Sequence, residues 1–173
     1  MIKIATHNSA TGEKSAGLLD WLLLPFARCQ NKTIKEQYEA GCRYFDIRYK
    51  WNNKRDCFVC GHGLWTSDRT LTSVLEQINE FGDCYVLLSC ETGSPLCKDA
   101  ILKIIEKYPK IKFTSFNKKK PIWKQYHHDK VLPHINGYRV LDWSSLHTLI
   151  PIPWLWKEEP EFRTDIFTFV DFL

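Results

Sequence analysis

Long apolar runs are missing from this 173-residue sequence, and none approaches the roughly 20 residues that a helix needs to span a bilayer. The N-terminal stretch before His7 is too short and too soon polar to be a secretory signal. The sequence also lacks internal repeats, low-complexity tracts and an obvious linker. These absences argue against a membrane-spanning helix and a repeat architecture, and they predict one domain over residues 1–173, built on a single core.

Positive residues outnumber negative residues only slightly, and the net charge is +4. That value is compatible with an anionic substrate or a membrane surface, and we expect no nucleic-acid partner. The seven cysteines cannot all pair with one another, and without an export signal they favour free thiols in a reducing compartment. We therefore expect a cytoplasmic protein. Tryptophan is abundant, with seven residues, and on loops it favours the boundary between water and an apolar phase.

Apolar periodicity and turn residues predict strands that alternate with helices. The expected strands are 2–5, 42–49, 57–60, 83–91, 111–114, 138–141 and 166–172, with a hairpin turn at 52–54. The expected helices are 17–30, broken near Pro25, and 34–40, 70–81 and 95–108.

This alternation favours an α/β fold with a mostly parallel sheet. Polar residues stand at or near the predicted carboxyl ends of several strands, where barrels and open α/β sheets place their chemistry. A full eight-unit barrel takes about 250 residues. We therefore expect a shortened or distorted TIM-like (β/α) barrel.

Four short motifs stand in a fixed order at or near the ends of plausible strands. They are Thr6-His7-Asn8-Ser9, the segment 40–48 that ends in Asp46-Ile47-Arg48, Gly61-His62-Gly63, and Phe169-Val170-Asp171-Phe172. Together they resemble the catalytic X domain of phosphatidylinositol-specific phospholipase C, especially the metal-independent bacterial type. The resemblance is strong to about residue 92 and returns only at the final strand.

The resemblance implies a phosphodiester-cleaving lipase that acts on phosphatidylinositol, or a related lipid, through a cyclic inositol phosphate. It implies that His7 is the general base for the inositol 2-hydroxyl and that His62 is the general acid for the leaving oxygen. Imidazole suits both roles because its ordinary pKa lies near neutral pH. Asp171 resembles the family's carboxylate that orients the base.

Arg48 bears on the question of a metal. The resemblance implies an acidic calcium ligand at this position in the eukaryotic enzymes and an arginine in the bacterial ones. A guanidinium can donate two parallel hydrogen bonds to a phosphate and supply the positive charge in place of a cation. We therefore expect no cofactor and no metal. Asp46, two residues earlier on the same strand, faces the same way and would orient Arg48 or His62.

Asn8 and Glu91 depart from the bacterial pattern and resemble the calcium-dependent branch. Their oxygens, with Asp46, form an alternative Ca²⁺ ligand set. Arg48 among them would oppose the ion and pair with Glu91 instead. We therefore assign Asn8 and Glu91 to substrate binding.

Two further surfaces favour peripheral contact with a membrane. The residues 118–130 are rich in Lys and His, with Trp123 and Tyr126 interleaved. The segments 21–26 and 151–156 combine Trp, Leu and Pro, and of these two we expect 21–26 to be buried in the core and 151–156 to lie at the rim. We expect a monomer that acts on a phospholipid or an inositol phosphate, in the cytoplasm and transiently at the membrane surface.

Two alternative functions remain open. One is a glycerophosphodiester or sphingomyelin-type phosphodiesterase, which would use paired acids around a divalent ion. The other is a catalytically silent module that binds lipid or inositol phosphate.

Overall fold

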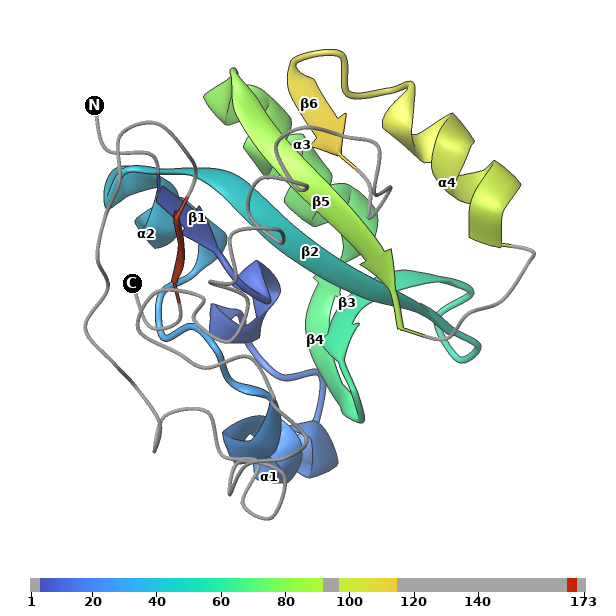
Figure 1. Ribbon diagram of the computed structural model, residues 1–173. Coiled ribbons are helices and arrows are strands. Elements are labelled where there is room, and N and C mark those ends of the chain that lie inside the picture. Colours follow the sequence, from blue (N-terminus) through green and yellow to red (C-terminus); the bar gives the residue numbers. More distant parts are fainter. Residues whose placement is uncertain (1–3, 92–96, 115–167, 171–173) are drawn as a thin grey trace, which may run out of the picture.

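The computed structural model describes residues 4–91, 97–114 and 168–170, which Figure 1 draws as coloured ribbon. The strands are β1 (Ile4–Thr6), β2 (Cys42–Asn52), β3 (Cys57–His62), β4 (Trp65–Thr70), β5 (Cys84–Cys90), β6 (Ile111–Thr114) and β7 (Thr168–Val170). The helices are the short 3-10 helix η1 (Ser9–Gly12), α1 (Leu18–Ala27), α2 (Ile34–Glu39), α3 (Leu71–Phe81) and α4 (Cys97–Ile105).

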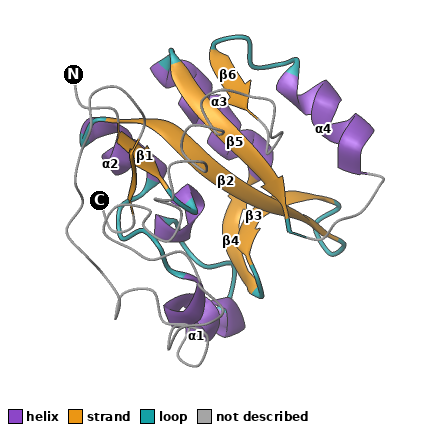
Figure 2. Cartoon of the chain, viewed as in Figure 1, coloured by secondary structure: helices purple, strands orange, loops and turns teal. Residues whose placement is uncertain are grey.

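Strand β2 is the hub of the sheet, and Figure 2 shows it as a long orange arrow across the molecule. It pairs in parallel with β1 and with β5, and in antiparallel with β3. Strand β1 also pairs in parallel with β7, β5 with β6, and β3 in antiparallel with β4. The sheet therefore joins a parallel part to an antiparallel β2–β3–β4 meander.

The expected TIM-like (β/α) barrel is wrong. Within the described ranges, β6 pairs with β5 alone and β7 with β1 alone, so the sheet is not closed. A closed (β/α) barrel needs parallel strands that are each followed by a helix. Here β2, β3 and β4 follow one another through tight turns, without helices between them. Such turns reverse the chain and produce antiparallel neighbours, so the result is a mixed, open sheet.

Helix α3 shows how the sequence forms and places an element. The Thr70 hydroxyl accepts a hydrogen bond from the Ser73 backbone N–H at 3.1 Å and so caps the first turn. Leu71, Val74, Leu75 and Ile78 recur at helical spacing and are fully buried. They join the main core with side chains of β2 and β5, among them Phe45, Ile47 and Val86.

Most of the expected elements in the described ranges are present. The hairpin of β2 and β3 pairs Tyr49 with Cys60, and Asn52 Oδ1 accepts from the backbone N–H groups of Lys54 and Arg55 in its turn. The expected break near Pro25 is wrong, because helix α1 keeps Pro25 inside its last turn and ends at Ala27. Strand β4 was not expected. The expected strand 138–141 and the segments 118–130 and 151–156 lie outside the described residues.

Two other expectations concern thiols and membrane spans. None of the cysteines whose side chains are described is in a disulfide: Cys29, Cys42, Cys57, Cys60, Cys84 and Cys90. Among the described helices, none combines the length and apolar character that crossing a membrane requires.

Candidate active site

The carboxyl ends of β1, β3 and β5 bring polar side chains to one place beside β2. His7 and Asn8 follow β1, Asp46 and Arg48 lie on β2, His62 ends β3 and Glu91 follows β5. Parallel pairing of β2 with β5 sets Arg48 opposite Ser89, and the Glu91 backbone N–H donates to the Tyr49 carbonyl at 2.9 Å. The structure therefore gathers six of the seven predicted site residues, and Asp171 lies outside the described residues.

The guanidinium of Arg48 is the centre of this group. Its Nη2 lies 3.1 Å from His7 Nε2, its Nη1 donates to Glu91 Oε1 at 3.2 Å, and its Nε donates to Asp46 Oδ2 at 3.4 Å. Burial alone would lower the pKa of Arg48, but the carboxylates of Asp46 and Glu91 outweigh it and raise that pKa. Because a guanidinium only donates, His7 Nε2 accepts, so its lone pair points at the centre of the site.

Asn8 holds the loop after β1 against Asp46. Its backbone has a φ of 45°, in the left-handed region that Asn tolerates better than most residues. In this conformation its backbone N–H donates to Asp46 Oδ2 at 3.2 Å. Its side-chain Nδ2 lies 3.2 Å from Cys29 Sγ and 3.4 Å from His62 Nδ1. Asn8 thus links the two segments that carry His7 and His62.

His62 is held in the neutral form by its surroundings. Burial is the largest cause that lowers its pKa to about 4, followed by the positive charge of Arg48 and a smaller effect of His7. Its Nδ1 lies 3.1 Å from the Ala27 carbonyl, so Nδ1 carries the proton and donates. The remaining ring nitrogen, Nε2, is then the one that a protonated His62 would use toward a leaving group.

Glu91 connects Arg48 to the backbone next to His62. One of its oxygens accepts from Arg48, and the other accepts from the Gly63 N–H at 3.0 Å. The predicted pairing of Arg48 with Glu91 is therefore confirmed. The predicted orientation of Asp46 toward Arg48 is confirmed as well, because strand alternation puts both side chains on one face of β2.

Three groups of the site were not expected from the sequence. Gln30 Nε2 donates to the His7 carbonyl at 3.1 Å, Cys29 contacts Asn8, and the Ala27 carbonyl accepts from His62. All three lie at the end of α1 or in the loop that follows it. No motif marks them, because two of these contacts involve backbone carbonyls, which any residue type supplies.

The carboxylates that could bind calcium already accept hydrogen bonds within the site. Glu91 uses both oxygens, and Asp46 Oδ2 already accepts from Asn8 and Arg48. Of the buried side-chain oxygens left without a hydrogen-bond partner, Asn8 Oδ1 and Asp46 Oδ1 belong to the predicted site residues, and Ca²⁺ takes six to eight oxygen ligands. No three described His, Cys, Asp and Glu side chains are grouped so that they could hold a metal ion.

Residues 22–89 match the family described as phosphatidylinositol-specific phospholipase C, X domain. The match confirms the resemblance predicted from the sequence and relates the chain to this family through that segment, which is less than half of its length. The matched segment contains Asp46, Arg48 and His62, while His7 and Glu91 lie outside it.

A solved structure that resembles the chain is the phosphatidylinositol-specific phospholipase C from Listeria monocytogenes. The two share 19% sequence identity with a TM-score of 0.49, over 69% of this chain and 52% of that one. The chain thus spans about half the length of that enzyme. No curated protein matches the chain.

Proposed function

We propose that the chain cleaves the phosphodiester of phosphatidylinositol, or of a related lipid, with His7 as general base and His62 as general acid. The observation that carries the proposal is the convergence of these two imidazoles, from distant parts of the chain, around Arg48. Arg48 contacts His7 at 3.1 Å, its positive charge acts on His62, and Asn8, the residue after His7, lies 3.4 Å from His62 Nδ1 through its side-chain Nδ2. Phosphodiester transfer is accelerated by a general base, a general acid and a positive group that stabilises the charge on the phosphate, and these three residues are of those types.

The proposed reaction uses each group once. His7 Nε2 takes the proton of the inositol 2-hydroxyl, and the freed oxygen bonds to phosphorus to form a cyclic phosphodiester. The bond from phosphorus to the diacylglycerol oxygen breaks, and His62 Nε2–H supplies the proton to that oxygen. Phosphate oxygens would replace His7 as acceptors of Arg48, which leaves the lone pair of His7 Nε2 for the hydroxyl. Each proton transfer contributes on the order of 10²–10⁴-fold in rate.

An anionic substrate also supplies the charge that His62 needs. In the free site its pKa is about 4, so the ring is neutral at neutral pH and cannot act as an acid. A bound phosphodiester brings a negative charge, which favours the protonated ring and raises its pKa. Substrate binding and protonation of His62 are therefore coupled in this proposal.

We propose that the reaction needs no metal ion. Support comes from the ion pairs of Arg48, which already engage the carboxylates of Asp46 and Glu91 at 3.4 and 3.2 Å. A guanidinium there supplies the charge stabilisation that a cation gives elsewhere.

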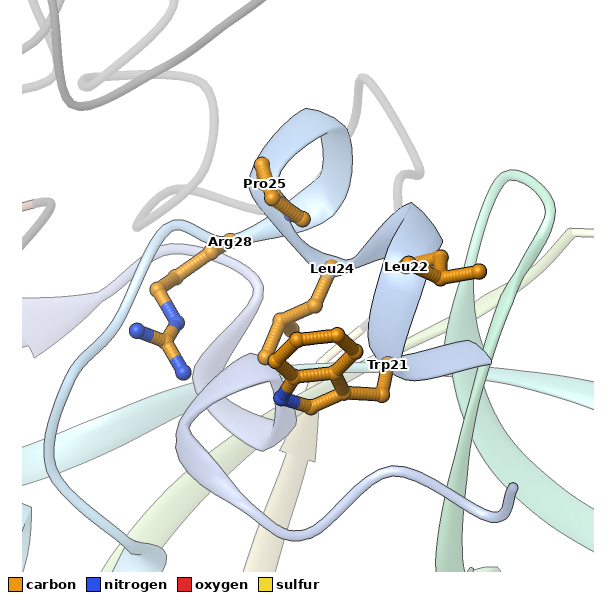
Figure 3. Close-up of a pocket in the computed structure, with 5 residues that line it drawn as sticks. All are labelled: Trp21, Leu22, Leu24, Pro25 and Arg28. Carbon is orange, nitrogen blue, oxygen red and sulfur yellow. The ribbon is translucent and has the colours of Figure 1, made fainter. Parts of the chain in front are cut away.

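We propose that α1 contacts the membrane from which the lipid is drawn. The helix exposes a series of apolar side chains, with Leu18 75%, Leu19 70% and Trp21 61% exposed. It also borders a pocket of about 320 Å³, and Figure 3 shows Leu24 between Trp21 and Arg28 there. Because the carbonyl of Ala27, its last residue, accepts from His62, an interface seated on α1 would lie beside the site. A cytoplasmic location and a monomeric state remain predictions.

The second candidate is a module that binds inositol phosphates without turnover. The neutral state of His62 in the free site favours it, because a ring that stays neutral in the complex supplies no proton. Phosphorus NMR of phosphatidylinositol vesicles separates the two functions. Catalysis predicts a cyclic phosphodiester signal that survives EDTA and disappears in the His7→Ala and His62→Ala variants. Binding of inositol phosphate without any cyclic product would support the module instead.

A further inference from the structure

The turn that carries His62 out of β3 is a backbone feature of the site with no role assigned so far. His62 is the last residue of β3, and β4 starts only three residues later at Trp65. Gly63 has a φ of +54° in this turn, a conformation that glycine adopts without strain. The position of the His62 backbone therefore depends on what holds the carbonyl and N–H groups of residues 63–65, while Ala27 and Asn8 contact its ring.

Lys50 holds these carbonyls from β2. Its Nζ donates to the carbonyls of Trp65 at 2.8 Å, Gly63 at 3.1 Å and Leu64 at 3.2 Å. An ammonium group has three N–H bonds, so this one turn accepts all of them. No other interaction in the described part of the site puts three donors on consecutive carbonyls.

The path of the Lys50 stem explains Gly61. A Cβ atom at this position would lie 2.8 Å from Lys50 Cε and 2.7 Å from the Trp65 carbonyl oxygen. Any larger residue would push the lysine stem or the turn away. The glycine before His62 therefore gives Lys50 room to reach the carbonyls.

Glu91 holds the same turn through a backbone N–H group. Its Oε2 accepts from the Gly63 N–H at 3.0 Å, while its Oε1 accepts from Arg48 at 3.2 Å. The turn is thus held at three carbonyls by a cation and at one N–H by an anion. Through Glu91, the position of the turn is tied to the guanidinium that contacts His7.

We propose that Lys50 and Glu91 are positioning residues that fix the turn 63–65 and so aim His62 at the leaving oxygen. Neither acts on the reacting atoms through this role. The proposal rests on the proposed function for its kinetic part, and it revises the expectation that Glu91 serves substrate binding. A lysine that only strengthened the β3–β4 turn would affect stability without affecting the chemistry at His62.

The test compares Lys50→Met with Lys54→Met, an exposed lysine in the β2–β3 turn. Methionine keeps a flexible stem and removes the charge and the donors. We expect Lys50→Met to lower kcat by on the order of 10–100-fold with KM nearly unchanged, because a small misplacement of a proton donor is costly. Lys54→Met should behave as the unmodified protein does.

A second readout does not depend on turnover. In NMR titrations the His62 imidazole of Lys50→Met should titrate closer to the ordinary histidine value, because a loosened turn exposes the ring. Lys50→Arg keeps the charge and should recover part of kcat, and Gly61→Ala should lower kcat as Lys50→Met does. If Lys50→Met fails to fold, the Lys50→Arg and Gly61→Ala variants carry the same two readouts.

The outcomes separate this proposal from the proposed function. An unchanged kcat and an unchanged His62 titration in the folded Lys50 and Gly61 variants would overturn the positioning role, whatever their thermal stability. A changed His62 titration in a protein that forms no cyclic product would support the positioning role and contradict the proposed enzyme.

Discussion

Arg48 has three donor nitrogens, and each faces a different partner in the site. His7, Asp46 and Glu91 receive them at 3.1 to 3.4 Å. A lysine at this position would place all its donors on one atom, so it could not match the spacing of three guanidinium nitrogens that face partners following β1, on β2 and following β5. The proposed replacement of a metal ion by this residue therefore depends on the guanidinium itself and not only on its charge.

Arg48→Lys should lower kcat/KM for phosphatidylinositol by on the order of 10²–10³-fold, as loss of a transition-state donor does. Arg43→Lys is the matched control on the same strand, because Arg43 donates to the Tyr38 and Cys42 carbonyls instead. Steady-state kinetics with and without EDTA checks both variants. A fully active Arg48→Lys protein, or an unmodified protein that EDTA inactivates, would contradict the metal-free proposal.

Because of His62, the free energy of unfolding should decrease as the pH falls. Its pKa is about 4 in the folded chain and near the ordinary value of 6.5 in the unfolded chain. Between these values the unfolded chain binds more protons, so the free energy of unfolding falls as the pH falls. This contribution is fully present above pH 6.5 and is lost on the way down to about pH 4.

Denaturant unfolding at several pH values checks this sign against His62→Gln, which cannot titrate. The free energy of unfolding of the unmodified protein should fall by on the order of 1–3 kcal/mol more than that of the variant over this interval. Equal pH dependence in the two proteins would show that His62 is not held neutral.

The sequence predicted side-chain contacts correctly where the alternation of a strand determines which way each side chain points. The spacing of Asp46 and Arg48 placed both side chains on one face of β2, and the ion pair at 3.4 Å confirms it. It failed where the partner is a backbone group or a residue from the end of α1 and the loop that follows it. Neither the Ala27 carbonyl nor Cys29 carries a local signature that relates it to His62 or Asn8.

At the scale of elements, α1 is unusual because it shows most of its apolar residues to solvent. Only Leu24 and Ala27 of this helix are buried, and both pack against Trp65 in a small cluster of their own. An apolar helix with so little cover is expected at a lipid interface.

Trp21→Ala should weaken binding to phosphatidylinositol vesicles by on the order of 10–100-fold, because burying a large apolar side chain contributes about 1.5–3 kcal/mol. Trp51→Ala is the control, since Trp51 is also exposed but lies on β2. Vesicle sedimentation gives the affinity, and a water-soluble inositol phosphodiester should be cleaved equally by both variants. Equal vesicle binding by both would contradict the role of α1.

Helix α3 represents the part of the fold that periodicity predicts well. Leu75→Ala removes a fully buried side chain from the main core and should lower the free energy of unfolding by about 2–5 kcal/mol. Leu102→Ala on α4 changes a side chain that is 50% exposed and should stay within about 0.5 kcal/mol. Urea unfolding checks both, and similar values would contradict the core assignment.

At the scale of the molecule, the sequence predicted which strands exist better than how they join. Tight turns after β2 and β3 make these strands antiparallel, and the unexpected strand β4 extends that meander. A barrel was inferred from strand–helix alternation, which is a local pattern, whereas closure depends on which edges pair. The predicted site residues come together even though the sheet is open, because the ends of β1, β3 and β5 meet beside β2.

The central claim is that His7 and His62 perform opposite proton transfers at one phosphorus. The most direct measurement compares each alanine variant on phosphatidylinositol and on an inositol phosphodiester with a p-nitrophenyl leaving group, which departs without a proton. The account predicts that His62→Ala regains most of its activity on the activated ester, because only the general acid has been removed. His7→Ala should stay inactive on both substrates, and recovery of both variants, or of neither, would contradict the account.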